Sequence, residues 1–219
     1  SGEGDDATIG SDRIAEALRN ARLNENTKAV VLRVNSPGGS ALASDVIWRE
    51  TQLIKEAKIP FVVSMSDLAA SGGYYIACGA DRIVASEATI TGSIGVFGML
   101  PNAQNLLENK IGVHTDRVGT NANGNIGLFS PLNETQYEAI EESISGIYDD
   151  FTSLVAEGRG MTQDAVKEVA GGRVWSGTDA IEAGLVDEIG TLERAKEIAA
   201  EMAGLADYKV KNYPKLKDP

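Results

Sequence analysis

Histidine and cysteine are nearly absent from this chain of 219 residues, which has one of each, His114 and Cys78. A lone cysteine cannot close an internal disulfide, and so few nitrogen and sulfur ligands exclude a Cys/His metal cluster. Cys78 lies in an apolar run, and we interpret it as a packing residue. We therefore expect neither a metal nor any other cofactor.

Long apolar runs and an excess of basic charge are also missing. No stretch approaches the roughly 20 apolar residues that span a bilayer. Acidic residues outnumber basic ones by 32 to 20, which gives a formal net charge of −12. An acidic surface repels phosphate backbones, so we do not expect nucleic acid as a partner.

The chain has the composition and length of an ordinary globular domain, with 42% hydrophobic and 24% charged residues. Residues 1–10 are polar and glycine-rich, which predicts a flexible lead-in. Residues 11–219 contain no internal repeat and no linker, so they are predicted to form a single domain.

Helical and strand patterns alternate along the first part of the chain. Apolar, β-branched runs predict strands at 29–34, 61–65 and 82–85, with a helix before the first strand and helices between the others. This order predicts an α/β fold with a mostly parallel sheet and flanking helices. Further on we expect strands at 112–118 and 209–213, and helices that begin near Asn133, Thr162, Ser176 or Thr178, and Thr191.

Two glycine-containing turns each join a predicted strand to a predicted helix. They are Asn35–Gly39 (NSPGG) and Ala69–Gly73 (AASGG). The carboxyl ends of parallel strands meet at one edge of the sheet, where ligands bind. Helix starts offer unpaired N–H groups, and glycine lets them approach a substrate oxygen closely, as an oxyanion hole requires. Ser71 is then the candidate nucleophile, with the N–H groups of Gly38 and Gly72 as oxyanion donors.

Other interpretations of these turns remain open from the residues alone. Both could be ordinary turns, or cradles for phosphate, although neither matches a dinucleotide or P-loop pattern. A serine nucleophile also needs a base. His114 is the only histidine, and we interpret it as a structural residue of the predicted strand at 112–118. The other option is a lysine whose pKa is lowered by burial.

Several segments together resemble the signal peptide peptidase A (protease IV) family. Asp67–Ala77 looks like the nucleophile segment of that family, and Thr89–Gly98 resembles a second family motif. Asn35–Gly39 resembles the oxyanion loop that the family shares with the Clp protease and crotonase folds. Gly171–Gly177 and Ala183–Asp187 resemble its C-terminal segments. The matching segments extend over most of residues 12–200.

The resemblance implies a fold of the Clp protease and crotonase type and a serine–lysine peptidase. Ser71 would be the nucleophile, Gly38 and Gly72 the oxyanion donors, and Ser93 the residue that orients the general-base lysine. Implied substrates are hydrophobic peptides, including cleaved signal peptides. The family also implies a homo-oligomer associated with the bacterial cell membrane, with its catalytic part outside the cytoplasm.

The lysine is where this chain departs from the family pattern. Short members carry it in the region that corresponds here to Thr120–Asn125, which contains no lysine. In tandem members the amino-terminal half provides the lysine and the carboxy-terminal half provides the serine. This chain resembles the second half alone, so we expect the missing amino-terminal half or another chain to supply the base. Lys110 is the lysine nearest to the loop and is expected on the surface.

Two alternative functions are kept. A crotonase-type enzyme acting on an acyl-CoA thioester would use the same pair of oxyanion loops but would not need Ser71. A catalytically incomplete domain that scaffolds an oligomer would need neither a base nor a nucleophile.

Overall fold

A six-stranded sheet forms the centre of the computed structural model, which describes residues 2–4, 8–116, 118–121, 123–124 and 126–214. Its strands are β1 (Val30–Ser36), β2 (Phe61–Ala70), β3 (Arg82–Ala85), β4 (Ile90–Gly92), β5 (Val174–Ser176) and β6 (Glu188–Ile189). Four of the strand pairs are parallel, and β4 with β5 is antiparallel. The predicted α/β class with a mostly parallel sheet is confirmed.

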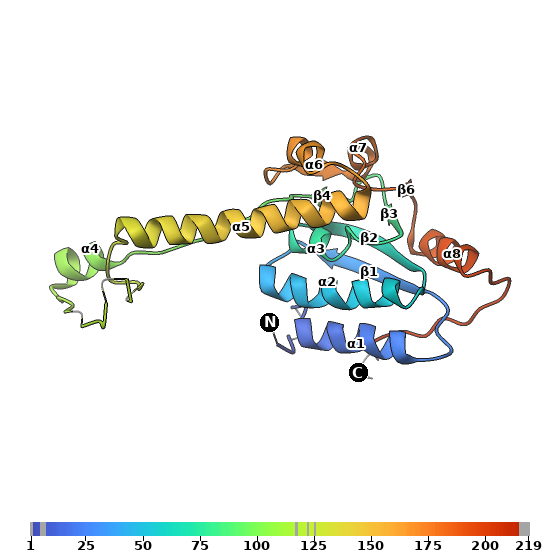
Figure 1. Ribbon diagram of the computed structural model, residues 1–219, viewed down its shortest axis with the longest axis horizontal. Helices are drawn as coiled ribbons and strands as arrows, with labels where there is room; N and C mark the ends of the chain where they lie inside the picture. The colour runs from blue at the N-terminus through green and yellow to red at the C-terminus, as the bar shows by residue number, and fades with distance from the viewer. Residues whose placement is uncertain (1, 5–7, 117, 122, 125, 215–219) are drawn as a thin grey trace. The chain divides into compact units, whose positions relative to one another are not determined.

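Helices precede, connect and follow these strands (Figure 1). They are α1 (Ser11–Leu23), α2 (Ala41–Glu56), α3 (Gly72–Tyr75), α4 (Gln104–Leu106), the π-helical segment η1 (Leu107–Ile111), α5 (Glu134–Arg159), α6 (Gln163–Val169), α7 (Gly177–Glu182) and α8 (Leu192–Met202). The predicted cap of α5 is confirmed: the Gln136 N–H donates to Asn133 Oδ1 at 2.8 Å, and the Asn133 N–H donates to Gln136 Oε1 at 3.0 Å.

The described chain divides into two compact units. We call Ser1–Gly95 with Asp150–Pro219 the sheet unit, and Val96–Asp149 the insert unit. The single domain expected over residues 11–219 therefore stays a prediction. Within the expected flexible lead-in, Gly4 and Ile9 form an isolated antiparallel bridge, and residues 1 and 5–7 lie outside the described residues.

Strand β2 is the middle of the sheet and is buried on both faces. Phe61, Val62 and Val63 are fully buried, as expected for a parallel strand covered on each side. Val62 packs with Val84 of β3 and with the apolar side of α8, formed by Ala195, Ile198 and Ala199. The first half of β2 pairs with β3, and its last three residues pair with β4. The C-terminal end of β2 therefore lies between β1 and β4, both of which pair with it.

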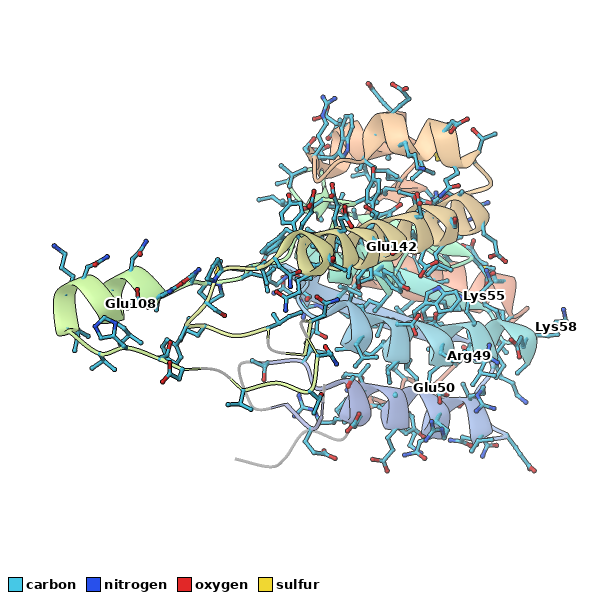
Figure 2. All side chains as sticks on the ribbon, turned by 60° about the vertical axis from the view of Figure 1, so that its left-hand side comes forward. Arg49, Glu50, Lys55, Lys58, Glu108 and Glu142 are labelled. Atoms are coloured by element: carbon cyan, nitrogen blue, oxygen red, sulfur yellow. The ribbon has the colours of Figure 1, made fainter. Side chains whose placement is uncertain are left out.

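A buried acidic residue joins the two long N-terminal helices. Glu50 of α2 is 4% exposed and lies between α1 and α2 (Figure 2). Its Oε1 accepts a hydrogen bond from Arg19 Nε at 3.0 Å, and its Oε2 lies 3.7 Å from an Arg22 nitrogen. Both arginines come from α1, so this contact fixes α1 on the outer side of α2.

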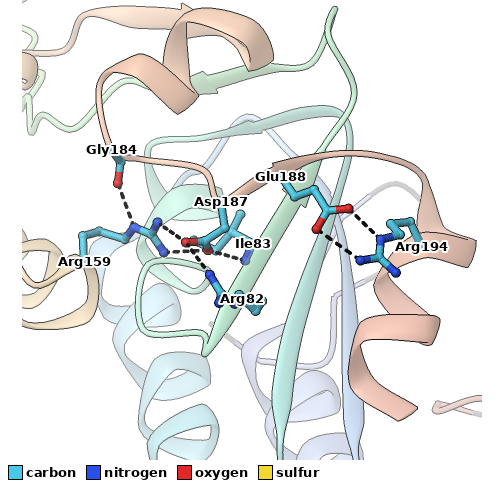
Figure 3. Close-up of polar contacts among 7 residues, drawn as sticks. All are labelled: Arg82, Ile83, Arg159, Gly184, Asp187, Glu188 and Arg194. Atoms are coloured by element: carbon cyan, nitrogen blue, oxygen red, sulfur yellow. Dashed lines mark hydrogen bonds and ion pairs between the residues drawn. The ribbon is translucent and has the colours of Figure 1, made fainter. Parts of the chain in front are cut away.

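A second buried charge pair joins the base of α5 to the turn before β6 (Figure 3). The Arg159 guanidinium, whose side chain is 8% exposed, donates twice to Asp187, at 2.8 and 3.0 Å, and once to Gly184 O. Asp187 also accepts the Ile83 N–H of β3 at 2.7 Å. The pair therefore connects a helix, a strand and a turn.

Tyr74 of α3 is held by the same turn. Burial raises the pKa of its phenol above the usual value, so the hydroxyl stays protonated and donates to Leu185 O at 2.9 Å. Because α3 begins directly after Ser71, this contact anchors the segment that carries the candidate nucleophile.

Some predicted elements are wrong, and some elements were not predicted. None of the described residues between 112 and 118, or between 209 and 213, belongs to a strand. Strands β4, β5 and β6 are only two or three residues long and were missed. Such short segments show no measurable alternation, and their pairing depends on residues far away in the chain.

Asp187→Asn is expected to destabilise the sheet unit by about 3 kcal/mol, because it leaves the buried Arg159 cation without its counter-charge. Asparagine keeps an oxygen for the Ile83 N–H, so the loss reports mainly on the ion pair. The measurement is urea unfolding followed by circular dichroism. Glu188→Gln is the control, since the Glu188–Arg194 pair is more exposed than the Arg159–Asp187 pair (Figure 3) and its loss should shift the midpoint much less. Equal shifts would contradict the assignment.

Candidate active site

The two predicted turns meet through their backbones. A Cβ placed on Gly38 would lie 2.5 Å from the Gly72 nitrogen and 2.7 Å from Ser71 Cβ. A Cβ placed on Gly73 would lie 2.5 Å from Ser36 O. All three distances are too short for real side chains, so the turns after β1 and β2 touch where only glycine fits. The structure therefore brings Ser71, Gly38 and Gly72 together.

Ser71 occupies a strained position between β2 and α3. Its backbone angles are φ 51° and ψ −120°, in a region that non-glycine residues rarely adopt. Two hydrogen bonds hold it there: its N–H donates to Gly92 O at 2.9 Å, and its carbonyl accepts the Tyr75 N–H at 2.9 Å. The residue is partly exposed. A serine on a sharp strand-to-helix turn has the setting of an activated nucleophile.

The amide groups around Ser71 differ in their surroundings. The Gly38 N–H donates to Ser36 Oγ at 3.1 Å. The nitrogen of Gly39 lies beside Gly72, 3.3 Å from where a Cβ of Gly72 would stand. Gly72 opens α3, and the first N–H groups of a helix have no partner within it. Amides from both turns therefore gather next to the Ser71 side chain.

Ser93 leaves the sheet next to Ser71. Ala70 of β2 pairs with Gly92 of β4, and neighbouring strands lie about 4.8 Å apart. The residues that follow, Ser71 and Ser93, both have positive φ, 51° and 48°. The Ser93 N–H donates to Arg173 O at 2.7 Å. Two partly buried serines thus stand side by side at the carboxyl edge of the sheet.

Two other candidate residues have surroundings unlike those of a catalytic group. Burial raises the pKa of the Cys78 thiol to about 12, so the thiolate needed for nucleophilic attack does not form near neutral pH. His114 belongs to the insert unit and is exposed, outside any strand. The structural role expected for His114 in a strand is wrong.

Three lysines lie at the opposite edge of the sheet from Ser71. Lys28 precedes β1, while Lys55 and Lys58 lie at the C-terminal end of α2 (Figure 2). Lys55 Nζ donates to Gly79 O at 2.7 Å and lies 3.8 Å from Asp81, just before β3. The seven residues of β1 separate the two edges by about 20 Å. None of these lysines reaches Ser71.

Two further lysines, Lys110 and Lys196, give no alternative partner for Ser71. Lys110 is exposed on the insert unit, as expected, and Lys196 pairs with Glu193 on α8. Among the residues that the structure describes, no hydrogen bond or ion pair joins a lysine to Ser71, and no group of three or more His, Cys, Asp or Glu could hold a metal ion. No described helix is long and apolar enough to cross a membrane.

The sequence analysis missed the strand that supports Ser93. Gly171–Gly177 was recognised as a family segment, but it received no structural role. It contains β5, which pairs with β4 next to Ser93. The available signal was the pair Val174 and Trp175, two residue types that favour strands and that here lie between glycines.

Comparison with known proteins identifies relatives over most of the chain. The model of "Peptidase family S49" matches residues 54–206. Protease 4 of Haemophilus influenzae is 45% identical over 92% of this chain and 32% of its own length. Serine protease SPPA, chloroplastic, of Arabidopsis thaliana is 41% identical over 91% of this chain and 29% of its own length. The chain thus spans about a third of these curated relatives.

A search of solved structures supports the predicted fold. A ClpP1 mutant from Listeria monocytogenes superposes with a TM-score of 0.57 at 18% sequence identity, and the match covers 84% of this chain and 86% of that chain. The predicted Clp protease-like fold is confirmed, because the match extends over most of both chains.

Gly38→Ala is expected to destabilise the protein by about 2–4 kcal/mol, because the added methyl group would overlap Gly72 and Ser71 and would strain φ of 99°. The control is Gly146→Ala in α5, where a methyl group meets nothing within 4 Å and helix propensity favours alanine by about 0.5–1 kcal/mol. Chemical unfolding of both variants checks this. A neutral Gly38→Ala would show that the turns are not in contact.

Proposed function

We propose that this chain, which belongs to peptidase family S49, is the serine-bearing part of a serine peptidase in which Ser71 forms an acyl-enzyme. The family assignment agrees with the resemblance drawn from its motifs. The observation that carries the proposal is the position of Ser71, strained and partly exposed beside the backbone amides of two glycine turns. Activity is proposed for the whole protein, since this chain spans about a third of its curated relatives.

The proposed reaction is a two-step acyl transfer. A neutral lysine takes the proton of the Ser71 hydroxyl while Oγ attacks the peptide carbonyl carbon. The tetrahedral intermediate collapses, the carbon–nitrogen bond breaks, and the lysine ammonium returns its proton to the leaving amine. Water, deprotonated by the same lysine, then attacks the ester carbon. The bond from that carbon to Ser71 Oγ breaks, the lysine ammonium returns its proton to Oγ, and the acid is released.

Backbone amides would stabilise the negative charge that develops on the substrate oxygen. The Gly72 N–H is one donor. Gly38 is the second donor predicted from the sequence, but its N–H is engaged by Ser36 Oγ, whereas the Gly39 nitrogen lies beside Gly72. We therefore propose that the Gly39 N–H acts with Gly72, and that Ser36 holds the turn in shape through Gly38.

Ser93 is proposed to orient the lysine. Its position one residue beyond the Ala70–Gly92 pair puts it next to Ser71, as a base-orienting hydroxyl requires. The lysine itself is proposed to come from a missing amino-terminal half or from another chain. The distant positions of Lys28, Lys55 and Lys58 support this, because all three lie at the other edge of the sheet.

Substrates are proposed to be hydrophobic peptides, such as cleaved signal peptides, bound by a membrane-associated homo-oligomer with its catalytic part outside the cytoplasm. The insert unit supports an apolar partner, because Phe97 and Met99 are 85% and 81% exposed. It also contains a cavity of about 450 Å³ with mostly apolar walls, lined by Leu100, Pro101, Asn102, Ile126, Gly127, Leu128, Ser130, Pro131 and Leu132.

Ser71→Ala is expected to abolish peptide cleavage and labelling by a serine-directed fluorophosphonate in the full-length protein, because both need Oγ. Mass spectrometry of the labelled protein locates the modified residue. Ser86→Ala is the control, since Ser86 is an exposed turn serine and its loss should leave both readouts unchanged. Cleavage that survives Ser71→Ala would favour the crotonase-type or scaffolding alternative.

Mixing this chain with the missing amino-terminal half is expected to raise peptide cleavage at least a hundredfold over this chain alone, because a positioned general base contributes about 10²–10⁴-fold. Substituting the lysines of this chain one at a time by methionine should leave the rate of the mixture within about twofold. Full cleavage by this chain alone, lost on substitution of one of its own lysines, would place the base in this chain and overturn the proposal.

A further inference from the structure

The turn that carries Ser93 depends on the edge strand β5. Gly92 of β4 pairs with Val174 of β5, and the ladder continues past both strand ends. The Ser93 N–H donates to Arg173 O at 2.7 Å, and the Gly172 N–H donates to Ile94 O at 2.9 Å. The strained turn is therefore bonded, through Ser93 and Ile94, to the two residues that directly precede β5.

The Trp175 ring packs directly against this turn. A Cβ placed on Gly92 would lie 2.6 Å from Trp175 Cδ1, so the indole closes one side of Gly92. Gly92 has φ of 76°, and its carbonyl accepts a hydrogen bond from the Ser71 N–H at 2.9 Å. Gly92 thus contacts the Trp175 ring, accepts the Ser71 N–H and directly precedes Ser93.

Independent contacts fix the plane of the Trp175 ring. Its Nε1–H donates to Val169 O at 3.0 Å. The Arg173 guanidinium carbon lies 4.0 Å from the ring centroid, in cation–π geometry. The ring is partly buried, and it is held at its edge by the Nε1 hydrogen bond and at its face by Arg173. Its orientation beside Gly92 is therefore fixed.

We infer that Trp175 is a positioning residue for Ser93: it supports the Gly92–Ser93 turn in its left-handed conformation and so fixes the Ser93 hydroxyl beside Ser71. The inference rests on the proposed function for its catalytic consequence. The physical reason is strain at Ser93, a non-glycine residue that keeps φ of 48° only while its surroundings hold it there. Gly92 adopts its φ of 76° without strain, because it is a glycine. Arg173 O accepts the Ser93 N–H, and the indole packs against Gly92, one residue before the strained bend.

The first test measures the amide hydrogen exchange of Ser93, which does not depend on any catalytic assumption. Trp175→Ala is expected to speed exchange of the Ser93 N–H at least tenfold, because the bond to Arg173 O opens more often. Ile198→Ala on α8 is the control for general loss of stability. It removes a buried side chain that packs with Val62 and Val84 and not with this turn. Unchanged exchange in Trp175→Ala, or equal acceleration in Ile198→Ala, overturns the inference.

The second test is a double-mutant cycle that measures peptide cleavage. It uses the active assembly of this chain with the segment that supplies the base, and Ser71 is left unchanged. Trp175→Ala is expected to lower kcat by about 10- to 100-fold with little change in KM, since small misplacements of catalytic groups cost that much. In a Ser93→Ala background, Trp175→Ala should lower kcat little further, because both substitutions remove the same function, that of the positioned Ser93 hydroxyl. Trp175→Phe, which keeps a ring against Gly92, should retain most of the activity.

Each outcome bears on one proposal. Additive losses in the cycle, or a rise in KM alone, overturn the role through Ser93 while leaving Ser71 as nucleophile. Absence of Ser71 labelling in the unaltered assembly overturns the proposed function, and Ser93 exchange then still decides whether Trp175 positions the turn.

Discussion

The contact between the two glycine turns is the constraint on which the rest of the site depends. Gly38 meets Gly72 and Ser71, and Gly73 meets Ser36, at separations that leave no room for a Cβ. Because backbone touches backbone, the amides and the Ser71 side chain are placed by the parallel pairing of β1 and β2 and not by flexible side chains. This pre-arrangement is what electrostatic stabilisation of a transition state requires, since the donors need not reorganise when charge develops.

Strain at Ser71 and Ser93 makes the surroundings of the site as important as its members. Both residues keep positive φ, and each is held by hydrogen bonds to a neighbouring segment: Ser71 to Gly92 and Ser93 to Arg173. Helix α3 is held in turn by the Tyr74 hydroxyl on Leu185 O, in the turn that Arg159 and Asp187 fix. The C-terminal segments that contain Arg173 and Leu185 therefore hold the backbone of the site in place. Their burial and ion pairing oppose the relaxation of a strained backbone.

Local signals predicted the parts of the fold and site that depend on neighbouring residues. A strand, a glycine turn and a helix start stand within a few residues of one another, so the turns at Gly38 and Ser71 could be recognised from the chain alone. The environment of Ser93 could not, because it needs the pairing of β4 with β5, two strands of three residues that lie far apart in sequence. The strand predicted around His114 failed for a related reason. Its valines suit a strand, but the described residues of the insert unit include no strand with which this segment could pair.

The topology that brings Ser71 and Ser93 to one edge of the sheet also places three lysines at the other edge. Parallel strands put their carboxyl ends, with Ser71 and Ser93, at one edge of the sheet, whereas the connections that carry Lys28, Lys55 and Lys58 return to the other edge. A lysine on those connections would have to cross the length of a strand, about 20 Å, which is several times the reach of its side chain. The position of these three lysines supports the proposal that a base for Ser71 comes from a segment that approaches the carboxyl edge from outside the sheet. Under that proposal catalysis depends on assembly, because the serine would be activated only where the lysine-bearing segment has docked.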